Sequence, residues 1–167
     1  MSEQDSTRQP AYRALASVAD SQAAIDEVIA TARHTLRLFD ISLTGRGFNA
    51  PARMERVREF LVAGRAHRLR IALHDVEMLE RDCPRLMVLL RQFPMSVEIH
   101  RTVGQARNAM DPFLLADDHS VWHQMHHEHP RAIVALHSPP DSVPIGQRFE
   151  EIWELSEPCA LGRVLGL

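Results

Sequence analysis

The chain has 167 residues and a mass of 19.0 kDa, and with 45% hydrophobic and 25% charged residues it can bury one sizeable core. Nineteen basic residues stand against 22 acidic ones, and the net charge of −3 makes nucleic acid an unfavoured partner. All 19 basic residues are arginine, which excludes mechanisms that need a lysine, such as a Schiff base or a P-loop.

The cysteines and the first residues indicate the compartment and the domain organisation. Cys83 and Cys159 lie far apart and form no CxxC pair, so neither a disulfide framework nor a thiolate zinc site is predicted. No apolar run resembles a signal peptide or approaches the roughly 18 residues that span a bilayer. We expect a cytoplasmic protein with no membrane partner. Residues 1–19 predict a flexible N-terminal lead, and 20–167 a single domain.

Helix and strand patterns alternate from the lead onward. Ser21 is expected to cap a helix, and Pro51 is expected to begin a second one at a favoured first-turn position. A third helix is predicted within 83–93. The strand patterns between and after these helices lie in residues 34–43, 68–75 and 96–101. Because parallel strands need a helix-length connection, this order predicts three parallel strands.

The pattern changes from Phe113 onward. Short strand patterns at residues 113–117, 120–124 and 131–137 are separated by turns, which predicts an antiparallel extension of the sheet. A last helix is expected over 146–155, ending before Pro158. The predicted fold class is therefore α/β, with a mixed sheet flanked by helices in a layered sandwich.

The order of these segments resembles one half of the phospholipase D-like superfamily. The likeness runs over residues 21–156 and is carried by FDISL, RLRIALHD, VEIHR, DPFLLADDHSVW and the closing FEEIW helix. Active members carry an H-x-K-x(4)-D motif, in which histidine attacks phosphorus and lysine holds the phosphate oxygens. This chain reads MDPFLLAD instead. Met110 and Pro112 stand at the histidine and lysine positions, and only Asp117 matches.

The resemblance implies a phospholipase D-like sandwich and argues against the activity. Loss of both the nucleophile and its electrostatic partner removes the groups that supply most of the rate. We therefore expect a catalytically inactive binding or interaction module, a pseudoenzyme with a degenerate active site. Two alternatives stay open: a phosphate-ester hydrolase or metal-dependent enzyme that uses sheet-edge histidine, aspartate and arginine residues, and a nucleic-acid-binding protein.

A ligand site is predicted where the parallel strands end, because open α/β sheets bind ligands at that edge. The candidate ligand-binding residues are Asp40, His74, Asp75, His100, Arg101 and Asp117. A small anion would suit them, with Arg101 or Arg46 as its clamp. The competing interpretation is that the strand-end aspartates only form local turns and caps.

The densest unusual feature is a run of histidines. The candidate metal ligands are His123, His126, His127 and His129. Against this, a hairpin aims neighbouring side chains at opposite faces, so a solvated loop is the competing interpretation. We expect no bound cofactor. The glycines of the 45–47 GRG segment predict an ordinary turn, because a dinucleotide fingerprint needs a third glycine.

Two observations predict how the chain assembles: the resemblance to the superfamily and one apolar surface patch. Active half-size relatives of the superfamily pair as homodimers across the face that carries the site. In addition, Trp122 and Met125 are expected to be exposed beside the histidine run, and apolar patches of this kind mark interfaces. A homodimer is therefore predicted.

Overall fold

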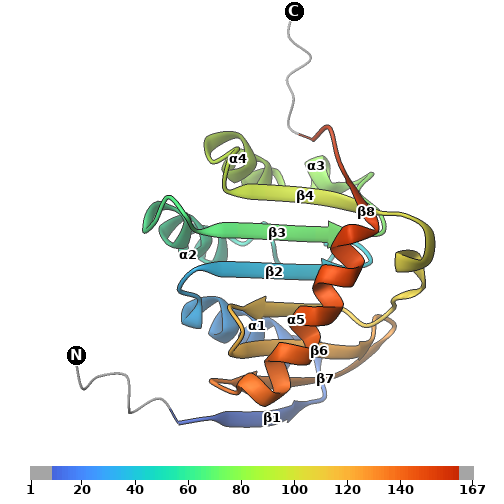
Figure 1. Ribbon diagram of the computed structural model, residues 1–167. Coiled ribbons are helices and arrows are strands. Elements are labelled where there is room, and N and C mark those ends of the chain that lie inside the picture. Colours follow the sequence, from blue (N-terminus) through green and yellow to red (C-terminus); the bar gives the residue numbers. More distant parts are fainter. Residues whose placement is uncertain (1–8, 162–167) are drawn as a thin grey trace, which may run out of the picture.

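Eight strands form one mixed sheet in the computed structural model, which describes residues 9–161 (Figure 1). The strands follow one another across the sheet in the order β1-β7-β6-β5-β2-β3-β4-β8. Their bounds are β1 Ala11–Leu15, β2 Thr35–Asp40, β3 Arg68–Leu73, β4 Val97–Thr102, β5 Phe113–Ala116, β6 Ser120–His126, β7 His129–Leu136 and β8 Ser156–Pro158.

Helices cover the two faces of the sheet unequally. The helical elements are α1 Val18–Thr31, α2 Pro51–Val62, α3 Leu79–Asp82, α4 Pro84–Gln92, the 3-10 turn η2 Gly104–Asn108 and α5 Pro139–Glu154. Figure 1 shows α5 alone crossing the front of the sheet, with α1, α2 and α4 behind it. Within residues 9–161, no helix combines the length and the apolar character that a membrane span requires.

The predicted parallel core is confirmed. β2 pairs with β3 and β3 with β4 in parallel, and the register places Leu38, Ile71 and Ile99 in one row. β5 joins the other side of β2 in the antiparallel sense, and β6 and β7 continue the antiparallel half. The sheet is therefore mixed, as the sequence predicts, and the fold class is confirmed.

Alternation along the central strands separates two cores. Leu38 and Ile71 belong to the larger one, with residues of α1, α2 and α4. Phe39 and Phe113 belong to the smaller one, which Phe149 of α5 completes. Successive strand residues point to opposite faces, so central strands between two helical layers are apolar on both sides. This burial holds the ends of β2 and β3 in fixed positions.

The N-terminal region differs from the prediction of a flexible lead over residues 1–19. Residues 1–8 lie outside the described part of the chain, but residues 11–15 form β1, which pairs with β7 in the antiparallel sense. The helix cap also differs. Ser17 caps α1 by accepting a hydrogen bond from the Asp20 N–H, whereas Ser21 is buried and accepts one from Trp122 Nε1. An edge strand with mostly exposed side chains has no apolar alternation to reveal it.

The C-terminal region is more regular than predicted. α5 begins at Pro139 rather than at residue 146, and a short strand, β8, follows it and pairs with β4. Proline is tolerated in the first helical turn, where N–H groups lack helical partners in any case. Pro139 and Pro140 therefore begin the helix, and Pro144 lies inside it.

Candidate functional site

The candidate site lies where β2 and β3 end and β5 begins. Asp40 closes β2, while His74 and Asp75 follow β3 directly. The His74 N–H donates to the Asp40 carbonyl at 3.3 Å. From the antiparallel half, the His127 N–H donates to the carbonyl of Met110 at 2.8 Å. The fold thus joins the predicted edge residues to the start of the segment that resembles the superfamily motif.

Asp40 is held by an arginine rather than left free for a ligand. Its side chain is 2% exposed and accepts from Arg46 Nε at 2.5 Å and from the Ile41 N–H at 2.7 Å. Burial raises the pKa of Asp40, and the hydrogen bond and charge of Arg46 offset that rise only in part. The Arg46 guanidinium also lies over the Trp122 ring at 5.1 Å. Arg46, one of the two arginines predicted to clamp an anion, therefore binds Asp40 instead.

His74 is buried with both ring nitrogens engaged. Nδ1 lies 2.5 Å from Thr102 Oγ1, and Nε2 lies 2.6 Å from the Ala109 carbonyl oxygen. A carbonyl only accepts, so Nε2 carries the proton and Nδ1 accepts from the threonine hydroxyl. Burial lowers the pKa of His74, and the bond to Ala109 offsets this in part. Through these two hydrogen bonds the neutral ring links β3 to β4 and to the segment before β5.

The motif positions at the start of β5 carry no nucleophile. Met110 is 37% exposed, and Pro112 uses its carbonyl to accept from the Gln124 N–H at 2.8 Å. Neither side chain has a proton to transfer or a cation to offer to phosphate.

Asp117 lies at the opposite edge of the sheet from Asp40 and His74, because β5 runs antiparallel to β2. Its carboxylate accepts from the N–H groups of Arg33, His34 and Thr35 at 2.8, 2.9 and 2.8 Å. Burial alone would raise the pKa of Asp117, but these backbone donors together lower it. The structure therefore does not bring Asp117 to the predicted ligand site, and its carboxylate is used to fix the entry to β2.

His100 and Arg101 also lie apart from the Asp40–His74 group. The His100 ring stacks on Trp153 with centroids 3.7 Å apart, and its Nδ1 lies 2.9 Å from Ser156 Oγ. Arg101 points to the other side of β4 and is 3.9 Å from the Glu157 carboxylate. Of the six predicted ligand residues, the structure groups Asp40, His74 and Asp75 at one edge.

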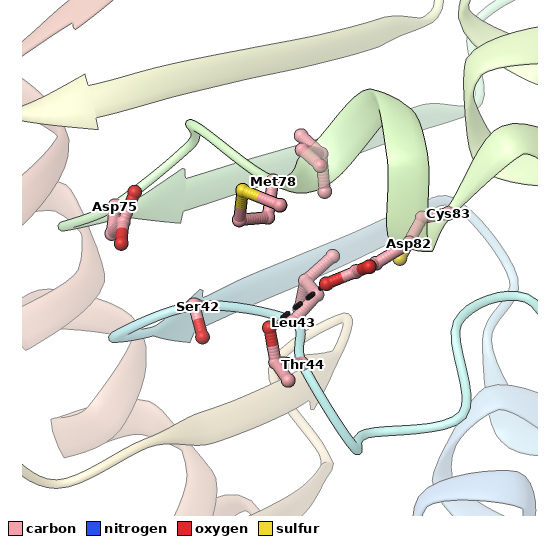
Figure 2. Close-up of a pocket in the computed structure, with 8 residues that line it drawn as sticks. Ser42, Leu43, Thr44, Asp75, Met78, Asp82 and Cys83 are labelled. Atoms are coloured by element: carbon pink, nitrogen blue, oxygen red, sulfur yellow. Dashed lines mark hydrogen bonds between the residues drawn. The ribbon is translucent and has the colours of Figure 1, made fainter.

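Asp75 borders a small hollow between the loops that follow β2 and β3. Figure 2 shows Asp75 and Ser42 on one side of it and the Thr44–Asp82 hydrogen bond, 3.2 Å long, on the other. Asp75 accepts from the Glu77 N–H, which is the local turn role expected of a strand-end aspartate. Cys83 lines the hollow too, and burial raises the pKa of its thiol to about 11, so it is not a ready nucleophile.

The predicted metal ligands do not converge. His126 stacks on His127 and lies beside His129, with centroids 4.8 and 5.6 Å apart, at the β6–β7 turn. His123 instead binds Asp111. In the part of the chain that the structure describes, no three histidine, cysteine or acidic side chains are grouped so that they could hold a metal ion.

A His–Asp–Arg group beside the motif positions escapes sequence reasoning. His123 Nε2 donates to Asp111 Oδ2 at 2.9 Å, and Arg148 of α5 donates to Asp111 Oδ1 at 2.5 Å. Burial alone would raise the pKa of Asp111, but these two partners lower it overall. The signal that could reveal this group is the hairpin register, which pairs Phe113 with His123 and so brings the start of β5 alongside β6.

Several solved structures resemble this chain in the arrangement of their helices and strands. Nuc, a phospholipase D family member from Salmonella typhimurium, is 13% identical with a TM-score of 0.60, and the match covers 90% of this chain and 99% of Nuc. NucT from Helicobacter pylori gives 9% identity, a TM-score of 0.60 and coverage of 90% and 100%. TrmBL2, an archaeal chromatin protein, gives 15% and 0.65; the match covers 92% of this chain but only 56% of TrmBL2.

These likenesses define a protein with a phospholipase D-like fold, as the sequence resemblance predicts. Residues 17–165 match the family described as a domain of unknown function (DUF7931), and the chain belongs to that family. No curated protein matches the chain.

Proposed function

We propose that this chain is a non-catalytic binding module built on a phospholipase D-like fold. The observation that carries the proposal is the pair Met110 and Pro112, which stand where active members of the superfamily carry histidine and lysine. A thioether and a pyrrolidine ring can neither attack phosphorus nor neutralise a phosphate oxygen.

The neighbouring imidazoles define the competing hydrolase. Both nitrogens of His74 are engaged, so this ring has no free atom for attack. His123 differs, because the bond from its Nε2 to the Asp111 carboxylate orients the ring and leaves Nδ1 as the candidate nucleophile of a phosphate-ester hydrolase.

The test is turnover by the purified full chain of bis(p-nitrophenyl) phosphate and of phosphatidylcholine vesicles. We expect no rate above buffer between pH 5 and 8. His123→Ala and His74→Ala are the matched variants. A rate in the parent chain that either variant abolishes would replace the binding-module proposal with the hydrolase.

A second candidate is DNA binding, and the similarity to TrmBL2 favours it, since that protein is described as showing a novel mode of DNA binding. The net charge of −3 opposes it. Fluorescence anisotropy with a labelled duplex decides between them. Saturable binding that weakens steeply with added salt would support the DNA-binding candidate, because phosphate contacts release counterions.

We also infer a reducing, cytoplasmic setting and a homodimer. Cys83 and Cys159 are both free thiols, which suits such a compartment. The dimer does not rest on Trp122, whose predicted exposure is wrong: the side chain is fully buried. Met125, 45% exposed, borders a largely apolar groove with Leu15 and Pro130, and this is the surface proposed for the contact.

A further inference from the structure

Three arginines share one face of the parallel strands, far from the Asp40–His74 edge. The register pairs Arg37 of β2 with Arg70 of β3, and Thr35 with Arg68. Residues two apart on a strand point the same way, and adjacent strands lie about 4.8 Å apart. Arg37, Arg68 and Arg70 therefore project together from the amino-terminal halves of these strands, on the side that carries α5.

This part of the sheet is open. Figure 1 shows α5 running obliquely over the carboxyl-terminal halves of β2 and β3, so that the halves where these strands begin have no helix in front of them. The three arginines line a cleft here, together with Asp118 and Glu150. Central parallel strands are normally apolar on both faces, so the presence of three arginines on one face of β2 and β3 calls for an explanation.

Arg37 forms the fixed base of the cleft. Its side chain is only 12% exposed, and Nη2 donates to Asp118 Oδ1 at 2.7 Å and to the Asp117 carbonyl at 2.8 Å. Gly146 of α5 lies over this pair, since a Cβ at that position would be 3.3 Å from Asp118 Oδ1 and 3.4 Å from the guanidinium. Arg37 Nη1 donates to Glu150 Oε1 at 3.3 Å, while its buried Nε has no hydrogen-bond partner within residues 9–161. Both terminal nitrogens of Arg37 are thus held by protein partners, and the side chain contributes mainly its charge to the cleft.

Arg68 and Arg70 have donors to spare. Arg68 donates to the carbonyls of Arg65 and His67 and has no carboxylate partner among residues 9–161. Arg70 is 37% exposed, and its Nε lies 3.7 Å from Glu98 without a hydrogen bond. Its guanidinium lies 5.7 Å from the centre of the Trp153 ring, which limits the orientations it adopts.

From these contacts we propose that the cleft binds a single phosphate group, with Arg68 and Arg70 as its donors and Arg37 as the buried charge beneath it. A guanidinium fork matches phosphate oxygens in two-point hydrogen bonds. The acidic side chains Asp118, Glu150 and Glu98 border the arginines and would repel a continuous polyanion. The ligand is therefore a small phosphorylated molecule rather than a nucleic acid.

This inference rests on the proposed function, because it names the ligand class of a chain that binds without turnover. The two are nevertheless tested separately. Hydrolysis of a phosphodiester would refute the binding-module proposal, whereas phosphate affinity at the cleft is measured with inorganic phosphate, which cannot be hydrolysed.

The experiment is titration of the full ¹⁵N-labelled chain with inorganic phosphate, followed through backbone amides and arginine Nε–H resonances. We expect saturable shifts at Arg68, Arg70 and Thr35, and none at the Asp40–His74 edge. Phenyl phosphate in a second titration tests a phosphate monoester, and a labelled oligonucleotide in a third tests a polyanion.

The variants locate the site. Arg68→Gln and Arg70→Gln should each weaken phosphate binding about tenfold, because a charge-assisted hydrogen bond is lost. Arg58→Gln is the matched control, since Arg58 is an exposed arginine of α2 on the other face. Glu98→Gln should tighten binding, because it removes the carboxylate next to Arg70; a purely structural role of Glu98 would not produce that gain.

Three results would overturn the proposal: no saturable phosphate binding, binding that Arg68→Gln and Arg70→Gln leave unchanged, or an oligonucleotide that binds more tightly than phenyl phosphate and loses affinity with the same substitutions. The last would assign the cleft to nucleic acid. Thermal melts of each variant establish that the fold is retained, and the gain expected from Glu98→Gln cannot arise from unfolding.

Discussion

At the scale of single residues, Asp117 has a structural role at the end of β5. Its φ of +53° lies in the left-handed region, which aspartate and asparagine tolerate better than most residues. Its carboxylate accepts three backbone N–H groups at the start of β2. The residue that matches the superfamily motif thus joins the antiparallel half of the sheet to the parallel half.

Asp117→Asn should lower the free energy of unfolding by about 2 kcal/mol, because an amide cannot accept three N–H donors as a carboxylate does. Asparagine keeps the left-handed backbone conformation, so the change isolates the hydrogen bonds. Urea unfolding at pH 7 measures the effect. Glu55→Gln is the control, since Glu55 is 60% exposed and lies 3.9 Å from the exposed Arg58, so the change should alter stability by less than about 0.5 kcal/mol. Equal losses in both variants would contradict the role given to Asp117.

The same carboxylate predicts an acid dependence. The pKa of Asp117 is lowered in the folded state, so its contribution is complete above the ordinary aspartate value and is lost as pH falls through the lowered one. The stability difference between the parent chain and Asp117→Asn should therefore shrink as the pH is lowered below about 4. A difference that is constant between pH 7 and pH 3 would exclude this explanation.

His74 predicts a dependence in a higher pH range. Burial lowers the pKa of His74 in the folded state, so below about pH 6.5 the unfolded chain takes up a proton that the folded chain resists. Its contribution to stability is full above that value and falls as the pH decreases. In His74→Gln, the slope of unfolding free energy against pH between 5 and 7 should be smaller than in the parent chain. Chemical denaturation at several pH values checks this.

At the scale of elements, the loop between β2 and α2 is built around Arg53. This buried side chain binds Asp26 at 2.7 Å and also donates to the carbonyls of Arg46 and Gln22. Gly47, with φ of +82°, lies against it. The GRG segment is a turn, as the sequence predicts, and it is fixed by contacts with α1 and α2 rather than open to a phosphate.

Gly47→Ala should cost about 3 kcal/mol, because a Cβ there would lie 2.7 Å from Gln22 Oε1 and 2.8 Å from Arg53 Nη1 and the backbone has a positive φ. Gly45→Ala is the matched control. Its φ is also positive, at +74°, but nothing lies within 4 Å of the added carbon, so only about 1 kcal/mol is expected. Thermal or urea unfolding compares the two. Equal costs would show that the contacts with Gln22 and Arg53 contribute nothing.

The elements also show what sequence reasoning could reach. The three parallel strands could be predicted because each appears in the sequence as a run of mostly apolar residues, which is typical of a strand buried on both faces. β1 and β8 were not, since edge strands with exposed side chains carry no such pattern. Asp40, His74 and Asp75 could be placed at one edge from strand direction alone. The arginine cleft could not, because Arg37 and Arg70 become neighbours only through the register of β2 and β3.

At the scale of the whole molecule, the homodimer prediction is tested by mass. Light scattering at high micromolar concentration should give twice the monomer mass of 19.0 kDa. Met125→Glu should shift it towards the monomer, because a charge would be buried against Leu15 and Pro130. Val62→Glu is the control, since Val62 is 58% exposed on α2. A monomer mass for the parent chain would contradict the prediction, and a Met125→Glu dimer would move the interface elsewhere.

The pairing of β1 with β7 has a consequence during synthesis. β1 is made first, yet its partner is completed only after nearly all of the described chain has been made. At typical translation speeds the nascent segment therefore waits on the order of ten seconds for its partner. The wait is harmless because Tyr12, Arg13 and Ala14 are exposed even in the finished sheet, so they offer little for misassociation while hydrated. β1 can therefore join the edge of the sheet only once β7 has been made, whereas β8, at the opposite edge, is made later still.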